Sequence, residues 1–141
     1  MRVVAIDYGL VRIGVAITDN LKLIAYPFKT VQTAKNFEKT SQNILDALKE
    51  HLNEIETIII GLPLSLKGSM SQMATEIQKF VEVLKTKTTI PIKFCDERLT
   101  SVMAERHLKD NLKLNRKKRS KIIDPIAATI LLQDYIQIYN I

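Results

Sequence analysis

Short apolar runs alternate with longer amphipathic stretches along the chain. Val3–Ile6, Ile13–Thr18 and about Ile24–Val31 are rich in β-branched residues and are separated by brief turns. Short turns between strands predict an antiparallel meander. Thr57–Leu62 and Ile90–Asp96 have the same composition and follow amphipathic stretches. The pattern therefore predicts five strands.

Helical periodicity fills the segments between the later strands. Apolar side chains recur at helical spacing from Phe37 to Leu52 and from Met70 to Leu84. Ser69 with Gln72 predicts a capping box at the start of the second helix. Thr100, or the serine after it, can cap a third helix that follows the fifth strand.

The start of the last helix has two interpretations. Pro125 suits the first helical position, which makes Asp124 the N-cap. The alternative is a helix that begins near Asn115 and kinks at Pro125. Both interpretations place Ala127 on the apolar face of the last helix.

The order of elements is β-β-β-α-β-α-β-α-α. It predicts an α/β fold in which three antiparallel strands are continued by two parallel crossover units, giving a mixed sheet with helices on both faces. The length of 141 residues predicts a single domain, residues 1–141.

Composition limits the setting and the partners. Lys and Arg number 21 against 15 Asp and Glu, a net charge of +6 that mildly favours an anionic partner. The lone Cys95 cannot form a disulfide within the chain, and no Cys/His cluster has zinc spacing, so we expect a reducing, cytoplasmic location and a buried thiol. No segment is long enough to span a membrane, and the first apolar run is too short for a secretory signal.

Three acidic residues interrupt apolar runs: Asp7, Glu97 and Asp124. Asp7 and Glu97 stand at the carboxyl ends of predicted strands, the edge where open α/β sheets form ligand sites. A carboxylate in such a place needs a cation or several donors, although Asp7 alone fits a turn equally well. Together they predict a site for Mg²⁺ or Mn²⁺. Two such ions can clamp both oxygens of a phosphodiester displacement.

Asp96 and Glu97 compete for the same role. Side chains alternate along a strand, so only one of the two can point into the site. We favour Glu97 because it is nearer the carboxyl end of the strand.

Candidate phosphate contacts carry basic or hydroxyl side chains near these acids. They are Arg12, Arg98, Thr100, Ser101, Arg116, Lys117, Lys118 and Arg119. Simple helix capping explains the two hydroxyl residues as well, and a basic run is by default a solvated face. His51 and His107 are expected on helix surfaces, facing solvent.

The motifs in order resemble the YqgF/RuvX family over essentially the whole chain. They are Asp7-Tyr8-Gly9, Arg12–Ala16, Gly61–Leu64, Asp96–Ser101, Arg116–Lys118 and Asp124 with Ala127-Ala128. The resemblance implies an RNase H-like fold related to Holliday-junction resolvases, and a metal-dependent nuclease that trims the 5′ end of pre-16S rRNA. It also implies that Asp7, Glu97 and Asp124 are the catalytic acids. Pro125 departs from the family, which often has Lys there.

The leading hypothesis is a two-metal-ion nuclease whose partners are structured RNA, pre-rRNA and ribosomal assembly intermediates. One alternative is a resolvase-like endonuclease acting on branched DNA, since the family carries that description as well. Another is a non-catalytic nucleic-acid-binding factor in ribosome assembly or transcription. An actin-like phosphotransferase would need two such domains, and the length gives one.

Overall fold

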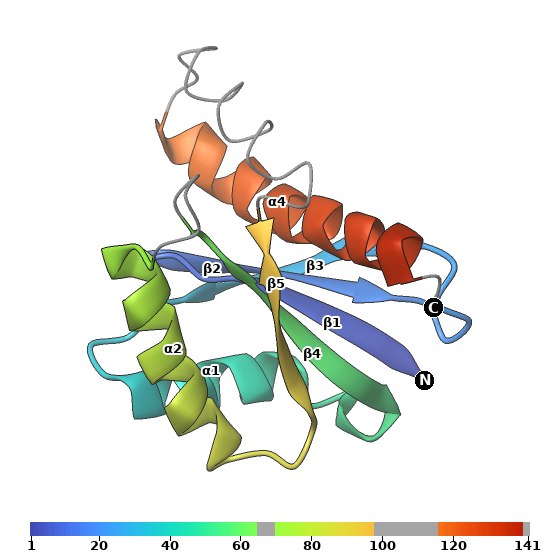
Figure 1. The fold of residues 1–141 in the computed structure, drawn as a ribbon, viewed down its shortest axis with the longest axis horizontal. Helices are drawn as coiled ribbons and strands as arrows, with labels where there is room; N and C mark the ends of the chain where they lie inside the picture. The colour runs from blue at the N-terminus through green and yellow to red at the C-terminus, as the bar shows by residue number, and fades with distance from the viewer. Residues whose placement is uncertain (65–69, 98–115, 140–141) are drawn as a thin grey trace.

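The sheet has five strands and is mixed, as the sequence predicts (Figure 1). The strands are β1 (Arg2–Asp7), β2 (Arg12–Thr18), β3 (Ala25–Gln32), β4 (Ile55–Leu62) and β5 (Ile92–Asp96). The computed structural model describes residues 1–64, 70–97 and 116–139, and within 116–124 it describes the backbone alone.

The strand order is β3-β2-β1-β4-β5. β1 pairs antiparallel with β2 and parallel with β4; β2–β3 is antiparallel and β4–β5 is parallel. The first strand is therefore central. The carboxyl ends of β1, β4 and β5 meet at one edge, which is called the carboxyl edge below.

Specific turn chemistry holds the β1–β2–β3 meander. In the first turn, a Cβ on Gly9 would collide with the carbonyl oxygen of Arg12, so only glycine fits. In the second, the Asp19 carboxylate accepts the N–H groups of Leu23 at 2.8 Å and Ile24 at 3.0 Å. The first turn joins β1 to β2 in the antiparallel register that places Asp7 opposite Gly14, and the second joins β2 to β3.

Helices cover both faces of the sheet (Figure 1). α1 (Phe37–Ala47) and α2 (Gln72–Lys85) pack on one face, and α4 (Arg116–Tyr139) crosses the other over β1, β2 and β3. No helix in the described ranges is long and apolar enough to cross a membrane.

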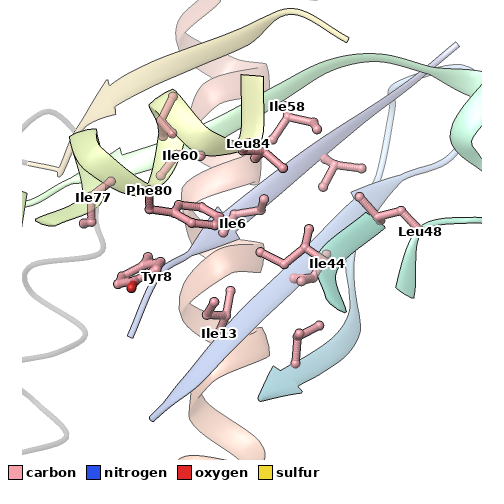
Figure 2. Close-up of a cluster of buried hydrophobic side chains, with 14 of the residues drawn as sticks. Ile6, Tyr8, Ile13, Ile44, Leu48, Ile58, Ile60, Ile77, Phe80 and Leu84 are labelled. Atoms are coloured by element: carbon pink, nitrogen blue, oxygen red, sulfur yellow. The ribbon is translucent and has the colours of Figure 1, made fainter. Parts of the chain in front are cut away.

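The core has two layers because β1 is buried on both faces, as its near-continuous apolar run indicates. Figure 2 shows the layer beneath α1 and α2, where the Tyr8 and Phe80 rings lie 4.9 Å apart. The opposite layer lies beneath α4. Its buried members are Val3, Ala5, Ala16, Ala25, Ile59, Cys95, Ala127, Ala128, Leu131, Leu132 and Tyr135. Cys95 is thus the buried thiol that the sequence predicts.

Two predicted starts of helices are wrong in position. The N-cap of α2 is Ser71, whose hydroxyl accepts the N–H of Ala74 at 3.0 Å and donates to the carbonyl of Pro63 at 2.7 Å. Ser69 lies outside the described residues. A serine two positions later competes successfully because its hydroxyl satisfies a helix donor and a loop carbonyl together.

The last helix begins at Arg116 and contains Pro125 in its interior, so Asp124 is not its N-cap. The alternative start near Asn115 is the better one. A run of good helix formers precedes the proline. The packing of α4 on the sheet, with propensity, outweighs the roughly 3 kcal/mol that an interior proline costs.

The first helix also ends earlier than predicted. α1 stops at Ala47 with Leu48 as its C-cap, and a separate 3-10 turn at Leu52–Glu54 leads into β4. The helix predicted after Thr100 lies outside the described residues.

Arg2 clamps the sheet at the edge opposite to the carboxyl edge. Its guanidinium donates to Glu54 at 2.8 Å, to the Thr18 carbonyl at 2.8 Å and to the Tyr26 hydroxyl at 2.9 Å. The same Glu54 oxygen lies 3.1 Å from Nδ1 of His51. Hydrogen bonding to Arg2, and then to His51, holds the pKa of the Glu54 carboxyl below its usual value.

Candidate active site

Asp7 is a buried carboxylate at the end of the central strand. It is 9% exposed, and it belongs to the face of β1 that carries Val3 and Ala5, beneath α4. Its partner across the sheet is Gly14 on β2. Since paired residues share a face, the position beside Asp7 has no side chain to fill it.

Glu97 is also buried, at 3% exposed, directly after β5. Its side chain lies over the backbone of Gly61 on β4. A Cβ built at Gly61 would stand 2.6 Å from Glu97 Oε1 and 3.2 Å from a methyl carbon of Leu131 on α4. Glu97 therefore occupies the space between the sheet and α4 that the missing side chain leaves.

The register brings the two acids to one level of the sheet. Ile6 pairs with Ile60, so Asp7 and Gly61 each follow the last paired residues of the parallel strands β1 and β4. Glu97 lies over Gly61, and Asp7 is therefore flanked by glycine on β2 and by glycine on β4. Two carboxylates thus share the α4 face at the carboxyl edge.

Asp96 is directed to the other face. It pairs with Leu62, which is packed in the layer beneath α1 and α2. The alternation expected from the sequence is therefore present, with Glu97 and not Asp96 on the side of Asp7.

Only some of the remaining predicted residues have side chains that the structure describes. Position 124 falls in α4, three residues before the buried Ala127, but the side chain of Asp124 lies outside those described. Arg12 opens β2, half-buried, and is paired with Gln32. Arg98, Thr100 and Ser101 lie outside the described residues. Arg116, Lys117, Lys118 and Arg119 form the first turn of α4, with their side chains outside the description. Among the described side chains, no three of His, Cys, Asp or Glu form a group that could hold a metal.

Acidic side chains surround the buried Cys95 thiol. Burial, followed by the charges of Asp96, Glu97 and Asp134, raises the pKa of the Cys95 thiol to about 11. The thiol therefore stays protonated and neutral at physiological pH, in keeping with a structural role.

The two glycines that flank Asp7 are site residues that sequence reasoning misses. The sequence places Gly61 near the end of the predicted strand Thr57–Leu62 and Gly14 within the predicted strand Ile13–Thr18, and it gives neither a role beside Asp7. The available signal is a glycine inside an apolar strand run, which marks a close approach of another group.

Similarity to known proteins decides the family. The sequence profile of the RuvX family, described as Holliday junction resolvase, matches residues 1–138. The chain belongs to the RuvX family. It is 44% identical over 139 residues to a protein of Protochlamydia amoebophila (strain UWE25) named "Putative pre-16S rRNA nuclease", covering 96% of this chain and 92% of that protein. An Endomicrobium trichonymphae protein of the same name is 41% identical over 139 residues, covering 99% of this chain and 97% of its own length.

Solved structures agree on the fold of this RuvX-family chain. RuvC of T. thermophilus in complex with a Holliday junction substrate is similar with a TM-score of 0.57 at 16% identity, covering 98% of this chain and 96% of that one. The human cytomegalovirus terminase nuclease domain is similar with a TM-score of 0.50 at 12% identity, covering 94% and 81%. The fold is RNase H-like, as the resemblance implied.

Proposed function

We propose that this protein is a divalent-metal-dependent nuclease that hydrolyses a phosphodiester bond at the 5′ end of pre-16S rRNA. The observation that carries the proposal is the placement of two buried carboxylates, Asp7 and Glu97, on one face of the carboxyl edge, at the level of Gly61. The names of the curated relatives support this substrate, and membership of the RuvX family supports the nuclease activity.

The donor set fits a hard cation. Asp7 and Glu97 offer carboxylate oxygens, the ligands that Mg²⁺ and Mn²⁺ prefer, and the flanking glycines keep side chains out of the space beside them. Asp124 is the third expected ligand, from α4. Bound there, the metal would supply Lewis-acid activation of water and stabilise the charge that develops on phosphate oxygens.

The chain's own residues would do the positioning. Glu97 is fixed by β5 and by its contact with Gly61, and Asp7 by the register of β1 with its two neighbours. Arg12, Arg98, Thr100 and Ser101 are proposed to contact phosphates near the break, and the basic first turn of α4 to contact the backbone farther along.

The test compares substrates and variants in one assay. Purified protein with Mg²⁺ or Mn²⁺ is incubated with a 5′-extended rRNA precursor and, separately, with a four-way DNA junction. We expect cleavage of the precursor, abolished by Asp7→Asn and by Glu97→Gln. These changes keep each side chain's shape and remove the charge that holds the metal.

Asp96→Asn is the matched control, because it removes the same charge on the opposite face of the same strand. We expect it to retain cleavage, and to lower stability by about 1–3 kcal/mol if it leaves a buried donor without its acceptor. Cleavage of the junction alone would favour the resolvase alternative, and binding without cleavage would favour the non-catalytic factor. Normal metal binding in Glu97→Gln with loss of metal binding in Asp96→Asn, measured by calorimetry, would move the site to the other face.

A further inference from the structure

A cavity of about 410 Å³ lies at the end of β1 on the face opposite to the acids. Its lining comes from the residues after β1, the β3–α1 connection and α2, and includes Tyr8, Leu10, Thr33, Lys35, Phe37 and Glu76. An adjoining cavity of about 380 Å³ shares two of these residues, Leu10 and Glu76. The two form one recess beside the proposed active site.

The recess is close to the acids along the chain. Tyr8 follows Asp7, so their Cα atoms are about 3.8 Å apart. Asp7 faces α4, whereas Tyr8 faces α1 and α2, and Figure 2 shows its ring at the margin of that apolar layer. A nucleic-acid strand bound at Asp7 can therefore pass over the carboxyl edge of the sheet and place a neighbouring nucleotide in the recess.

The apolar part of the lining suits a flat ring. Tyr8 and Phe37 contribute aromatic surface, and Leu10 is 65% exposed although it is large and apolar. Unstacked bases are commonly held against such side chains.

The polar part of the lining includes an acidic side chain, Glu76, and a basic one, Lys35. Glu76 is half-buried on α2 and carries a negative charge, which repels phosphate and attracts hydrogen-bond donors. Burial, and then the charge of Glu76, raises the pKa of the Tyr8 hydroxyl, so the two groups are electrostatically close. Lys35 is exposed, at the solvent side of the same lining, and can meet a phosphate there.

We propose that this recess binds a guanine base next to the scissile phosphate, with Glu76 as the residue that selects it. The proposal rests on the nuclease function proposed above. Guanine presents two adjacent donors, N1–H and the N2 amine, and a carboxylate can accept both. The Watson–Crick edges of adenine, cytosine and uracil each offer a single donor beside an acceptor, which a carboxylate would repel.

The experiment measures binding without cleavage. Short single-stranded RNAs of uridine, with one guanine placed at each position in turn, are titrated in EDTA and followed by fluorescence anisotropy. Matched RNAs carry adenine or inosine at the same position, and inosine lacks only the N2 amine. We expect guanine at one position to bind about tenfold tighter than adenine, as for other bidentate contacts to a base, with inosine between them.

Two charge-matched variants assign the effect. Glu76→Gln keeps the shape of the side chain, and we expect it to reduce the preference for guanine to less than about twofold. Glu82→Gln removes the same charge from an exposed position on the same helix, and it should keep the preference.

Several results would overturn the proposal: equal binding at every position, an unchanged preference in Glu76→Gln, or an equal loss in Glu82→Gln. The readout is independent of the nuclease proposal, because Asp7→Asn should retain the preference while losing cleavage. If the wild-type protein prefers guanine but cleaves no substrate, the proposed nuclease activity is wrong and the assignment of the recess as a guanine site still holds.

Discussion

Gly61 determines where the Glu97 carboxylate can lie. A methyl group at this position would stand 2.6 Å from Glu97 Oε1 and 3.2 Å from Leu131, with the β4 backbone holding it in place. Either Glu97 or α4 must then move. Residue 61 thus links the geometry of the acids to the packing of the last helix.

We predict that Gly61→Ala lowers the free energy of unfolding by about 1–3 kcal/mol, the usual cost of overpacking a filled site, and that it also reduces cleavage. Urea unfolding and the precursor assay check the two effects. In a Glu97→Ala background the same substitution should cost clearly less, because its main clash is gone. An equal cost in both backgrounds would contradict the contact.

At the residue scale, the sequence predicted that Asp7 and Glu97 lie at the carboxyl edge, where the structure has them, but it did not predict what surrounds them. A carboxylate that ends an apolar run is conspicuous, and strand alternation was enough to separate Glu97 from Asp96. The glycine positions beside Asp7 depend on register between strands distant in sequence, which local patterns do not contain.

At the scale of single elements, Ser71 joins α2 to the loop after β4. Its hydroxyl accepts from the Ala74 N–H and donates to the Pro63 carbonyl. We predict that Ser71→Ala costs about 1–2 kcal/mol in chemical denaturation. Ser71→Asp keeps the acceptor for the Ala74 N–H but cannot donate to the Pro63 carbonyl, so it should cost less stability than Ser71→Ala. A larger cost for Asp than for Ala would contradict the role of the hydroxyl as a cap.

The clamp formed by Arg2 should make stability depend on pH at acid values. The pKa of Glu54 is lowered in the folded protein, so the stability it contributes is present above its unfolded value of about 4.3 and is lost as pH falls through the folded value. We predict that Glu54→Gln lowers the melting temperature at pH 7 and that the difference from wild type disappears at lower pH.

Melting curves between about pH 2.5 and pH 7, a range that spans the titration of carboxylates, check this prediction. Glu50→Gln, at an exposed neighbouring position, is the control. A difference that stays constant across the whole range would show that charge is not the cause.

Element boundaries were predicted less well than the elements themselves. The five strands and the three α-helices of the described residues were expected from the sequence pattern, but α1 ends early and α4 runs through Pro125. Caps depend on loop partners such as the Pro63 carbonyl, and an interior proline is tolerated only where tertiary packing compensates it.

For the whole molecule, the net charge of +6 is concentrated at the start of α4. We predict that replacing Arg116, Lys117, Lys118 and Arg119 by Ala weakens nucleic-acid binding without altering the metal requirement. For each phosphate that the variant no longer neutralises, the slope of log K against log [salt] should become shallower by about 0.7 on a single strand and about 0.9 on a duplex. A control that replaces the exposed Lys39, Lys49, Lys79 and Lys87 should change the slope less. Equal slopes for wild type and the α4 variant would make the run a solvated face.

The overall topology followed from the sequence because short turns and crossover lengths leave few arrangements. The order of strands and helices along the chain predicted the mixed sheet. The continuous apolar run of β1 indicated burial on both faces, and therefore a helix layer on each side. The recess beside Tyr8 could not be predicted, since its walls come from three segments joined only in the folded chain.

The central place of β1 has a consequence for synthesis of the chain. β1 pairs first with β2, which follows after one turn, but its parallel partner β4 starts only at Ile55, and β5 completes the sheet later still. The proposed acids, at positions 7, 97 and 124, are made in three separate stages as the ribosome elongates the polypeptide. A nascent chain that has not yet released α4 therefore lacks the proposed third acid, Asp124, and the proposed site cannot be complete before α4 has emerged.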